Sequence, residues 1–192
     1  MDPSPELLVI SDTHGDLPAL VLVFRWAKRR GIGMLAFLGD GLSDVTRACE
    51  KTRFKPLVRT VRGNGDTDSS VPFKQTLDFL NVRFLLVHGH SYSVQETLDS
   101  LVFNARTAGA SVALFGHTHT PFRAIFRGIL LVNPGSPSRP RNGAEPSFAT
   151  IRCDGDGKIL ADHWRIDGDG SIHEYDLSAK KSPGGVEPPE RV

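Results

Sequence analysis

The sequence predicts an α/β domain with either one mixed sheet or two packed sheets. Short apolar runs alternate with helix-like segments over the first part of the chain, as they do in layered α/β folds. Later, residues 148–166 have a hairpin pattern that turns at residues 154–157. The 192 residues, 39% of them hydrophobic, have the length and composition of one globular domain with a sizeable buried core.

Three strands and two helices are predicted in the first third of the chain. Continuous apolar runs indicate buried strands over 7–10 and 34–38, and a third strand is expected over 57–62. Apolar residues recur at helical spacing over 17–30, and the basic residues that close this segment are typical of a helix C-terminus. A shorter helix is expected over 44–53. Strand and helix therefore alternate from the start of the chain.

The middle of the chain continues this pattern. Strand-like apolar runs occupy 82–87, 112–115 and 129–132. Apolar residues spaced for one helix face predict a helix over 94–108. Together with the hairpin, these elements give a layered domain in which parallel and antiparallel strands coexist.

Composition and charge exclude several classes of protein. We expect one domain over 1–177, followed by a flexible tail over 178–192 that is rich in Pro, Gly and charge. The net charge of +1 gives no support for a nucleic-acid partner, and no apolar run approaches the ~18 residues that would span a membrane. The N-terminus has no secretory signal pattern, and Cys49 and Cys153 suit reduced thiols, so we expect a cytoplasmic protein.

Polar residues gather where five of the predicted strands end. Each strand runs into Asp, Asn or His beside glycine, and the carboxyl ends of strands in α/β sheets are where binding sites form. These residues are Asp12 and His14, Asp40, Asn64 and Asp66, His88 and His90, and His117 and His119. Any one cluster is explained by a turn or a helix cap, but five at successive strand ends favour one shared site.

The residue types at these strand ends are those of a metal site. Imidazole nitrogens with carboxylate and amide oxygens suit Mn²⁺, Fe²⁺, Co²⁺, Ni²⁺ or Zn²⁺. No cysteine lies in any of the clusters, which argues against a structural zinc site. The sequence therefore predicts a site for divalent first-row metals at one edge of the sheet.

The order of the motifs resembles the calcineurin-like metallophosphoesterase superfamily. Asp-x-His, Gly-Asp, Gly-Asn-x-Asp, His-Gly-His and Gly-His-x-His follow one another, and with Asn133-Pro134-Gly135-Ser136 they look most like its small YfcE-type phosphodiesterase branch. The resemblance covers residues 7–166. It implies a four-layer α/β/β/α sandwich with two mixed sheets, and a phosphoesterase that hydrolyses a small phosphate ester, most of all a phosphodiester.

The resemblance also implies a dinuclear metal centre. In it a hydroxide held between two divalent ions, Mn²⁺ foremost among the first-row metals, attacks phosphorus. The implied ligands are Asp12, His14 and His119 for one metal, Asn64, His88 and His117 for the other, and Asp40 between the two. The alternative is a protein-interaction scaffold of the same fold with little or no turnover, which is known among proteins similar to this family.

One position departs from the larger phosphatases of the superfamily. They carry histidine after the Asn of the third motif, whereas this chain has Gly65, which cannot donate a proton to a leaving group. We therefore expect weak activity on monoesters with poor leaving groups. His90 and Asp66 are candidate substitutes, and for Asp66 we favour a role in orienting a ligand histidine. The apolar residues of 73–84 fit either core packing or a homo-oligomer contact.

Overall fold

The chain folds into two sheets that pack face to face, in a computed structural model that describes residues 5–154, 156 and 158–178. The first sheet has the order β11-β10-β9-β1-β2-β3 and the second has the order β4-β5-β6-β8-β7. The strands of the first sheet are β1 (Leu7–Ile10), β2 (Met34–Phe37), β3 (Leu57–Thr60), β9 (Ser147–Cys153), β10 (Ile159–Ile166) and β11 (Ile172–Glu174). Those of the second are β4 (Lys74–Phe79), β5 (Val82–Val87), β6 (Val112–Leu114), β7 (Pro121–Phe126) and β8 (Ile129–Pro134).

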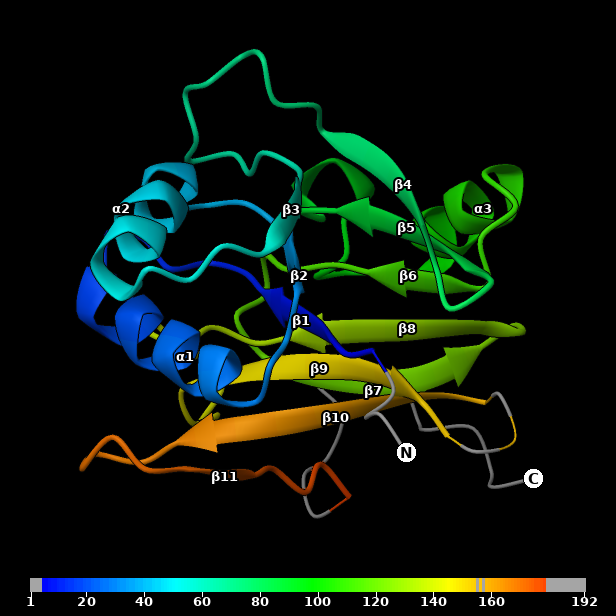
Figure 1. Cartoon of the computed structure of the whole chain (residues 1–192). Helices are drawn as coiled ribbons and strands as arrows, with labels where there is room; N and C mark the ends of the chain where they lie inside the picture. The colour runs from blue at the N-terminus through cyan, green and yellow to red at the C-terminus, as the bar shows by residue number, and fades with distance from the viewer. Residues whose placement is uncertain (1–4, 155, 157, 179–192) are drawn as a thin grey trace.

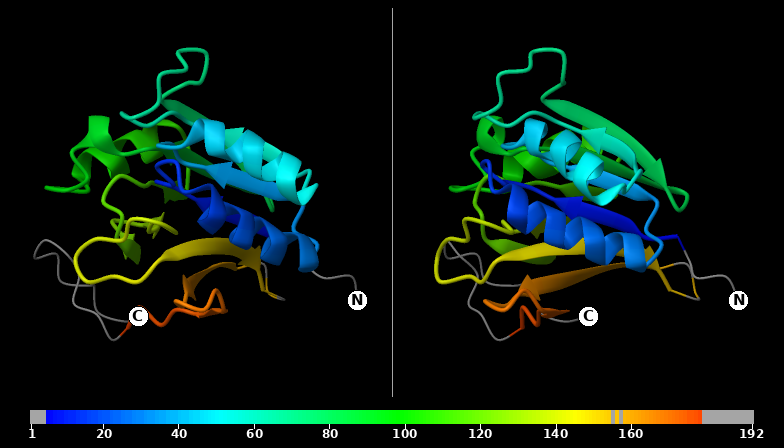
Figure 2. Two further views of the ribbon diagram at one scale, coloured as in Figure 1. Left: turned by 90° about the vertical axis from the view of Figure 1, so that its left-hand side faces the viewer. Right: turned by 60° about the vertical axis from the view of Figure 1, so that its left-hand side comes forward.

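Helices cover the outer face of each sheet. The helices α1 (Leu17–Arg29) and α2 (Leu42–Thr52) lie on the first sheet, and α3 (Asp99–Thr107) lies on the second. Two further views, in Figure 2, show the same arrangement of helices outside and sheets inside. The chain therefore has the four-layer α/β/β/α sandwich with two mixed sheets that was expected (Figure 1).

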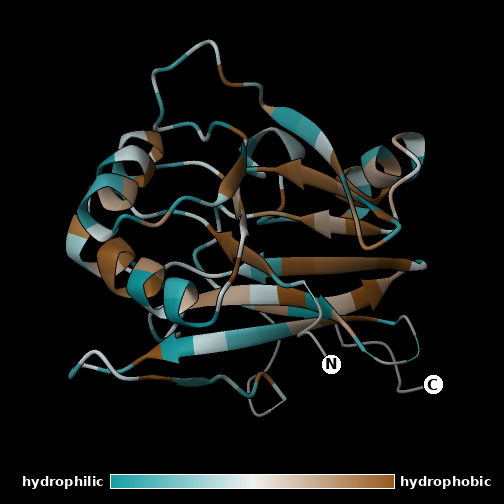
Figure 3. Ribbon diagram, viewed as in Figure 1, coloured by the Kyte–Doolittle hydropathy of each residue, from teal (hydrophilic) through white to brown (hydrophobic). Residues whose placement is uncertain are grey.

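Three apolar clusters fill the spaces between these layers. One lies under α1 and α2, one lies between the sheets, and one lies under α3. In Figure 3, β5 and β8 are hydrophobic along most of their length, whereas the edge strand β4 is largely hydrophilic. Central strands are buried on both faces, which is why they appear in the sequence as continuous apolar runs.

Most of the predicted elements are confirmed, with shifted ends. The strand predicted over 57–62 stops at Thr60, α2 begins two residues before the predicted start at residue 44, and α3 begins at Asp99 instead of residue 94. A short 3-10 helix over His90–Tyr92 precedes the predicted segment, and residues 93–96 form a turn. Val94 and Leu98 are nevertheless buried, because the turn before the helix packs them under the same sheet.

Three strands were not predicted, namely β4, β7 and β11. Each lies at the edge of a sheet, and most of their residues are exposed or only partly buried. Within residues 73–84, Leu77 and Phe84 are buried between the sheets and serve core packing, whereas Phe73 is exposed and the homo-oligomer contact stays a prediction. The tail predicted over 178–192 lies, beyond its first residue, outside the described part of the chain. No helix among the described residues is long and apolar enough to cross a membrane.

Candidate metal centre

Four loops meet where parallel strands of the two sheets end. Strands β1 and β2 run parallel in the first sheet, and β5 and β6 run parallel in the second. The backbone of Asp12 donates to the carbonyl of Gly39 at 2.9 Å, and that of Gly116 donates to the carbonyl of His88 at 2.8 Å. The loops after β1, β2, β5 and β6 are thus hydrogen-bonded in pairs, which places their polar side chains at one edge of the sandwich.

The described residues contain two groups of three potential ligands each. One group is Asp12, His14 and His119, and the other is Asp12, Asp40 and His88; within each group the ligand atoms lie within 4.8 Å of one another. The His119 Nε2 atom lies 3.2 Å from Asp12 Oδ1 and 3.1 Å from His14 Nε2. The two groups share Asp12, so they form one continuous cluster.

The buried donor atoms of this cluster fit a metal. His88 donates its Nδ1 hydrogen to the Leu38 carbonyl at 2.7 Å, and His119 donates its own to the Arg139 carbonyl at 2.6 Å. Each bond leaves the Nε2 lone pair for a ligand and fixes the ring's tautomer, as is usual for metal-binding histidines. The buried atoms His88 Nε2 and Asp12 Oδ1 have no hydrogen-bond partner among the described residues. Such atoms are costly to bury unless a cation completes them.

The charge balance of the cluster also favours a cation. Burial raises the pKa of Asp12, but the His119 and His88 rings next to its carboxylate outweigh burial, so this pKa lies below its ordinary value. Burial lowers the pKa of His14 and of His117 below their ordinary values. Ionised carboxylates beside neutral imidazoles are the protonation states that metal binding requires.

The loops reach this geometry through unusual backbone conformations. Five residues of the predicted clusters have a positive φ, which is uncommon for any residue but glycine although Asp, Asn and His tolerate it best. They are Asp12 at 60°, His14 at 46°, Asp40 at 58°, His117 at 68° and His119 at 56°. Backbone strain of this kind persists only where the surroundings enforce it, and it concentrates at functional sites.

Two glycines allow the loops to approach the carboxylates. A Cβ atom on Gly63 would lie 2.0 Å from Asp40 Oδ1, and one on Gly116 would lie 1.9 Å from Ser11 Oγ and 2.7 Å from Asp12 Oδ2. No side chain fits at such distances. The glycines of these two motifs are therefore required by close packing around the two aspartates.

Asp66 holds the loop that carries Asp40. Its carboxylate accepts four backbone hydrogen bonds, from Asp40 at 2.7 Å, Gly63 at 2.8 Å, Gly41 at 2.9 Å and Leu42 at 3.0 Å. Burial raises its pKa, but these bonds outweigh burial and keep the pKa below its ordinary value. The carboxylate thus orients the loop of Asp40 rather than a histidine ring, and its lowered pKa disfavours a role as proton donor.

The remaining predicted residues lie around the cluster. His117 donates its backbone N–H to Asp12 Oδ2 at 3.0 Å, and its ring centroid lies 5.2 Å from that of His88. The His90 ring lies 5.4 Å from the His88 ring and 6.2 Å from that of His117. Asn64 is exposed, between Gly63 and a Gly65 whose backbone donates to Asp40 Oδ1 at 2.7 Å. The roles assigned to these side chains stay predictions.

A turn after β8 supports the cluster from behind. Asn133 donates to the Gly116 carbonyl at 2.9 Å and to Thr118 Oγ1 at 3.0 Å, so it holds the loop of the last two histidines. Ser136 and Ser138 donate to the Asp12 carbonyl at 2.8 and 3.2 Å. The sequence signal for this support is the Asn133-Pro134-Gly135-Ser136 turn itself, whereas Ser138 had no signal.

A family model, the calcineurin-like phosphoesterase superfamily domain, matches residues 6–156. The chain belongs to this superfamily. It is 30% identical over 156 residues to the probable metallophosphoesterase YsnB of Bacillus subtilis, a match that covers 80% of this chain and 88% of YsnB. It is also 30% identical over 170 residues to phosphodiesterase YfcE of Escherichia coli, covering 78% of this chain and 88% of YfcE.

Solved structures agree with this membership. The crystallised YfcE phosphoesterase superposes with a TM-score of 0.63 at 26% identity, covering 88% of this chain and 98% of YfcE. Vacuolar Protein Sorting 29 from Cryptosporidium parvum superposes with a TM-score of 0.73 at 20% identity, covering 91% of this chain and 97% of that protein. The second likeness concerns the fold alone. Members of the superfamily bind divalent metals, and this chain has a candidate ligand set for them.

Proposed function

We propose that this protein is a phosphodiesterase with a dinuclear metal centre. The observation that carries the proposal is the pair of ligand groups that share Asp12, with buried nitrogen and oxygen atoms that have no partner among the described residues. Asp40 Oδ2 lies 3.8 Å from His14 Nε2 and 3.6 Å from His88 Nε2, so this carboxylate also reaches both groups. A carboxylate between two groups suits two ions in close proximity, as in two-metal phosphoesterases. Superfamily membership and the 30% identity to a protein named a phosphodiesterase support the same conclusion.

The ligand assignment is part of the proposal. We place one ion on Asp12, His14 and His119, and the other on Asn64, His88 and His117, with Asp40 between the two. Bound there, two divalent ions such as Mn²⁺ would make a hydroxide available near neutral pH and neutralise charge on the phosphoryl group. The chain's own task is to present its ligands in fixed tautomers, through the Leu38 and Arg139 carbonyls.

The preference for diesters follows from the residues that could protonate a leaving group. Gly65 has no side chain, and Asp66 is engaged with four backbone N–H groups at a lowered pKa. His90 stays the candidate, because its ring lies beside those of His88 and His117. Burial lowers the pKa of His90, so at neutral pH it holds a proton weakly. Esters with good leaving groups are then favoured over monoesters with poor ones.

The test is hydrolysis by metal-stripped protein with and without added Mn²⁺. The substrates are bis(p-nitrophenyl) phosphate and p-nitrophenyl phosphate, and the variants are Asp40→Asn and His117→Ala. We expect Mn²⁺-dependent cleavage that favours the diester, and a loss of at least 100-fold in each variant. The matched control is His173→Ala, which removes an exposed histidine of β11 and leaves the rate unchanged.

Three other results would contradict this proposal. If calorimetry shows no Mn²⁺ binding, the assignment of the ligands is wrong. One that binds Mn²⁺ but cleaves neither ester favours the scaffold alternative. Cleavage that survives in both variants places the chemistry elsewhere in the molecule.

A further inference from the structure

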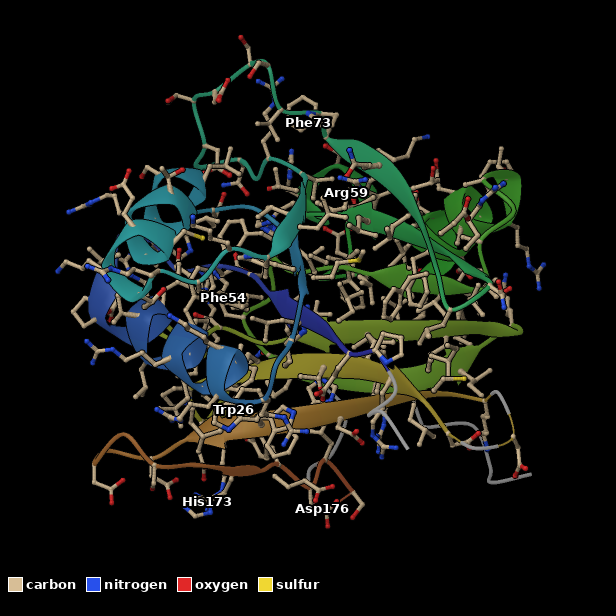
Figure 4. All side chains as sticks on the ribbon, in the orientation of Figure 1. Trp26, Phe54, Arg59, Phe73, His173 and Asp176 are labelled. Carbon is tan, nitrogen blue, oxygen red and sulfur yellow. The ribbon has the colours of Figure 1, made fainter. Side chains whose placement is uncertain are left out.

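An exposed aromatic side chain stands next to the candidate metal centre. Phe73, just before β4, is 46% exposed, and Figure 4 labels it at the foot of the loop that leads into this strand. Its ring meets the His90 ring edge-on, with centroids 5.5 Å apart and planes at 62°. His90 in turn adjoins the rings of His88 and His117. Only one other ring therefore separates Phe73 from the candidate ligands.

Phe73 is distinct among the exposed apolar side chains. Four large hydrophobic residues are exposed in the described part of the chain, namely Leu57, Phe73, Phe103 and Ile125. Among these four, Phe73 is the one whose ring contacts a histidine of the predicted clusters. Single exposed apolar side chains are common on protein surfaces, so it is the contact of this ring with His90, beside the candidate ligands, that points to a role in binding.

Arg62 holds this ring in place. The Arg62 guanidinium carbon lies 3.9 Å from the Phe73 ring centroid, a close cation–π contact. The Arg62 backbone N–H donates to the Pro72 carbonyl at 2.9 Å and so closes the loop between these residues. The buried Arg62 Nε has no hydrogen-bond partner among the described residues. The loop thus fixes an aromatic surface and a cation together beside the metal ligands.

We propose that Phe73 and Arg62 form a subsite for a planar aromatic group carried by the phosphoester. The inference rests on the proposed function, because the metal centre would hold the phosphoryl end of the same molecule. The exposed part of the Phe73 ring offers a stacking surface, and aromatic pairs gain energy beyond simple burial. The Arg62 charge polarises that surface and adds attraction for an anionic ester. An alkyl ester would gain the charge attraction but not the contact between rings.

The test compares two phosphonates that differ in their organic group. Phenylphosphonate and methylphosphonate bind to Mn²⁺-loaded protein in a calorimetric titration, which needs no turnover. We expect the wild-type protein to bind phenylphosphonate about tenfold more tightly, and Phe73→Ala to reduce this ratio to about one. Phe73→Leu, which keeps apolar bulk without a ring, should retain an intermediate ratio.

The ratio separates a binding role from a structural one. If Phe73 served only to anchor its loop, the Ala variant would weaken both ligands equally and leave the ratio unchanged, which would overturn the proposal. The matched control is Phe103→Ala, which removes an exposed phenylalanine on α3 and should leave the ratio as in the wild type.

Failure of this inference is distinguishable from failure of the proposed function. A protein that cleaves diesters but binds the two phosphonates equally has the activity without the subsite. A protein that cleaves no ester but prefers phenylphosphonate, with the preference lost in Phe73→Ala, has the subsite without the activity. Absence of binding by either phosphonate overturns the subsite.

Discussion

At the scale of single residues, the carboxylate of Asp66 organises more backbone than any other predicted site residue. Its four hydrogen bonds connect the loops after β2 and β3. Two of them come from Gly41 and Leu42 at the start of α2, where a helix terminus favours negative charge. An ionised side chain therefore stabilises the position of Asp40 without being a ligand.

We predict that Asp66→Asn destabilises the metal-free protein by about 2–3 kcal/mol. The amide places an NH₂ group against backbone donors and removes the charge that strengthens these bonds. Urea unfolding measures the loss, and Mn²⁺ calorimetry should show weaker binding because the loop of Asp40 loosens. Asp68→Asn, at an exposed position two residues on, is the control. Equal stability of the two variants would refute the role of Asp66.

At the scale of elements, the end of β8 and the turn that follows it support the loops of the candidate metal centre. The side chain of the buried Asn133, next to the last residue of β8, binds the loop after β6, and Ser136 binds the loop after β1. Within the turn, Asn133 Oδ1 accepts from the Gly135 backbone at 2.9 Å. One strand end therefore holds two of the four loops that carry the candidate ligands, one from each sheet.

We predict that Asn133→Ala costs about 2–3 kcal/mol of folding free energy. Its loss leaves the Gly116 carbonyl and the Gly135 N–H without their partner, and buried unsatisfied groups are penalised. Asn104→Ala is the matched change on α3, where the side chain only returns to its own helix at Ser100. Thermal unfolding should show a clearly lower melting temperature for the first variant and a near-normal one for the second.

At the scale of the whole molecule, a few polar contacts join the two sheets across their apolar interface. His163 of β10 donates Nε2–H to the Asn133 carbonyl of β8 at 2.8 Å. Ser147 of β9 donates to the Pro134 carbonyl at 2.9 Å, and Arg123 of β7 donates to the Ala161 carbonyl. Burial lowers the pKa of His163 to about 4, with Arg123 contributing to the shift. The packing of the sheets thus depends on a neutral histidine.

We predict that acid weakens this packing between pH 6.5 and pH 4. Because the folded pKa is the lower one, the unfolded chain binds the proton first, so stability is full above pH 6.5 and falls until about pH 4. A drop from 6.5 to about 4 corresponds to about 3 kcal/mol. Urea unfolding of metal-free wild type and His163→Gln at several pH values measures the effect.

The difference between the two proteins isolates His163, because all other titrating groups are shared. Glutamine can donate to the same carbonyl without titrating. The stability advantage of the wild type over the variant should therefore shrink by about 3 kcal/mol from pH 7 to pH 4. An advantage that stays constant over this range would disprove the role of His163, and His173→Gln, at an exposed position, should show no such trend.

The sequence by itself determined the central strands, the superfamily and the candidate ligands. Strands such as β1 and β5 are buried on both faces, so their residues form apolar runs that can be recognised in the sequence. The glycine and polar residues at the ends of these strands can be recognised in the same way, because each loop needs only a few consecutive residues to turn and present a side chain. The order of these motifs along the chain then identified the superfamily.

Tertiary structure alone decided three of the four edge strands, β3 being the exception, and the supporting residues. Strands β4, β7 and β11 have no apolar run longer than three residues, since a sheet edge faces solvent and takes its pairing from a neighbour. The partners of Asp66 lie as much as 26 residues away, and the Ser138 bond to Asp12 spans 126 residues. Contacts of that span arise when separate elements pack, so no local pattern encodes which side chains support the site.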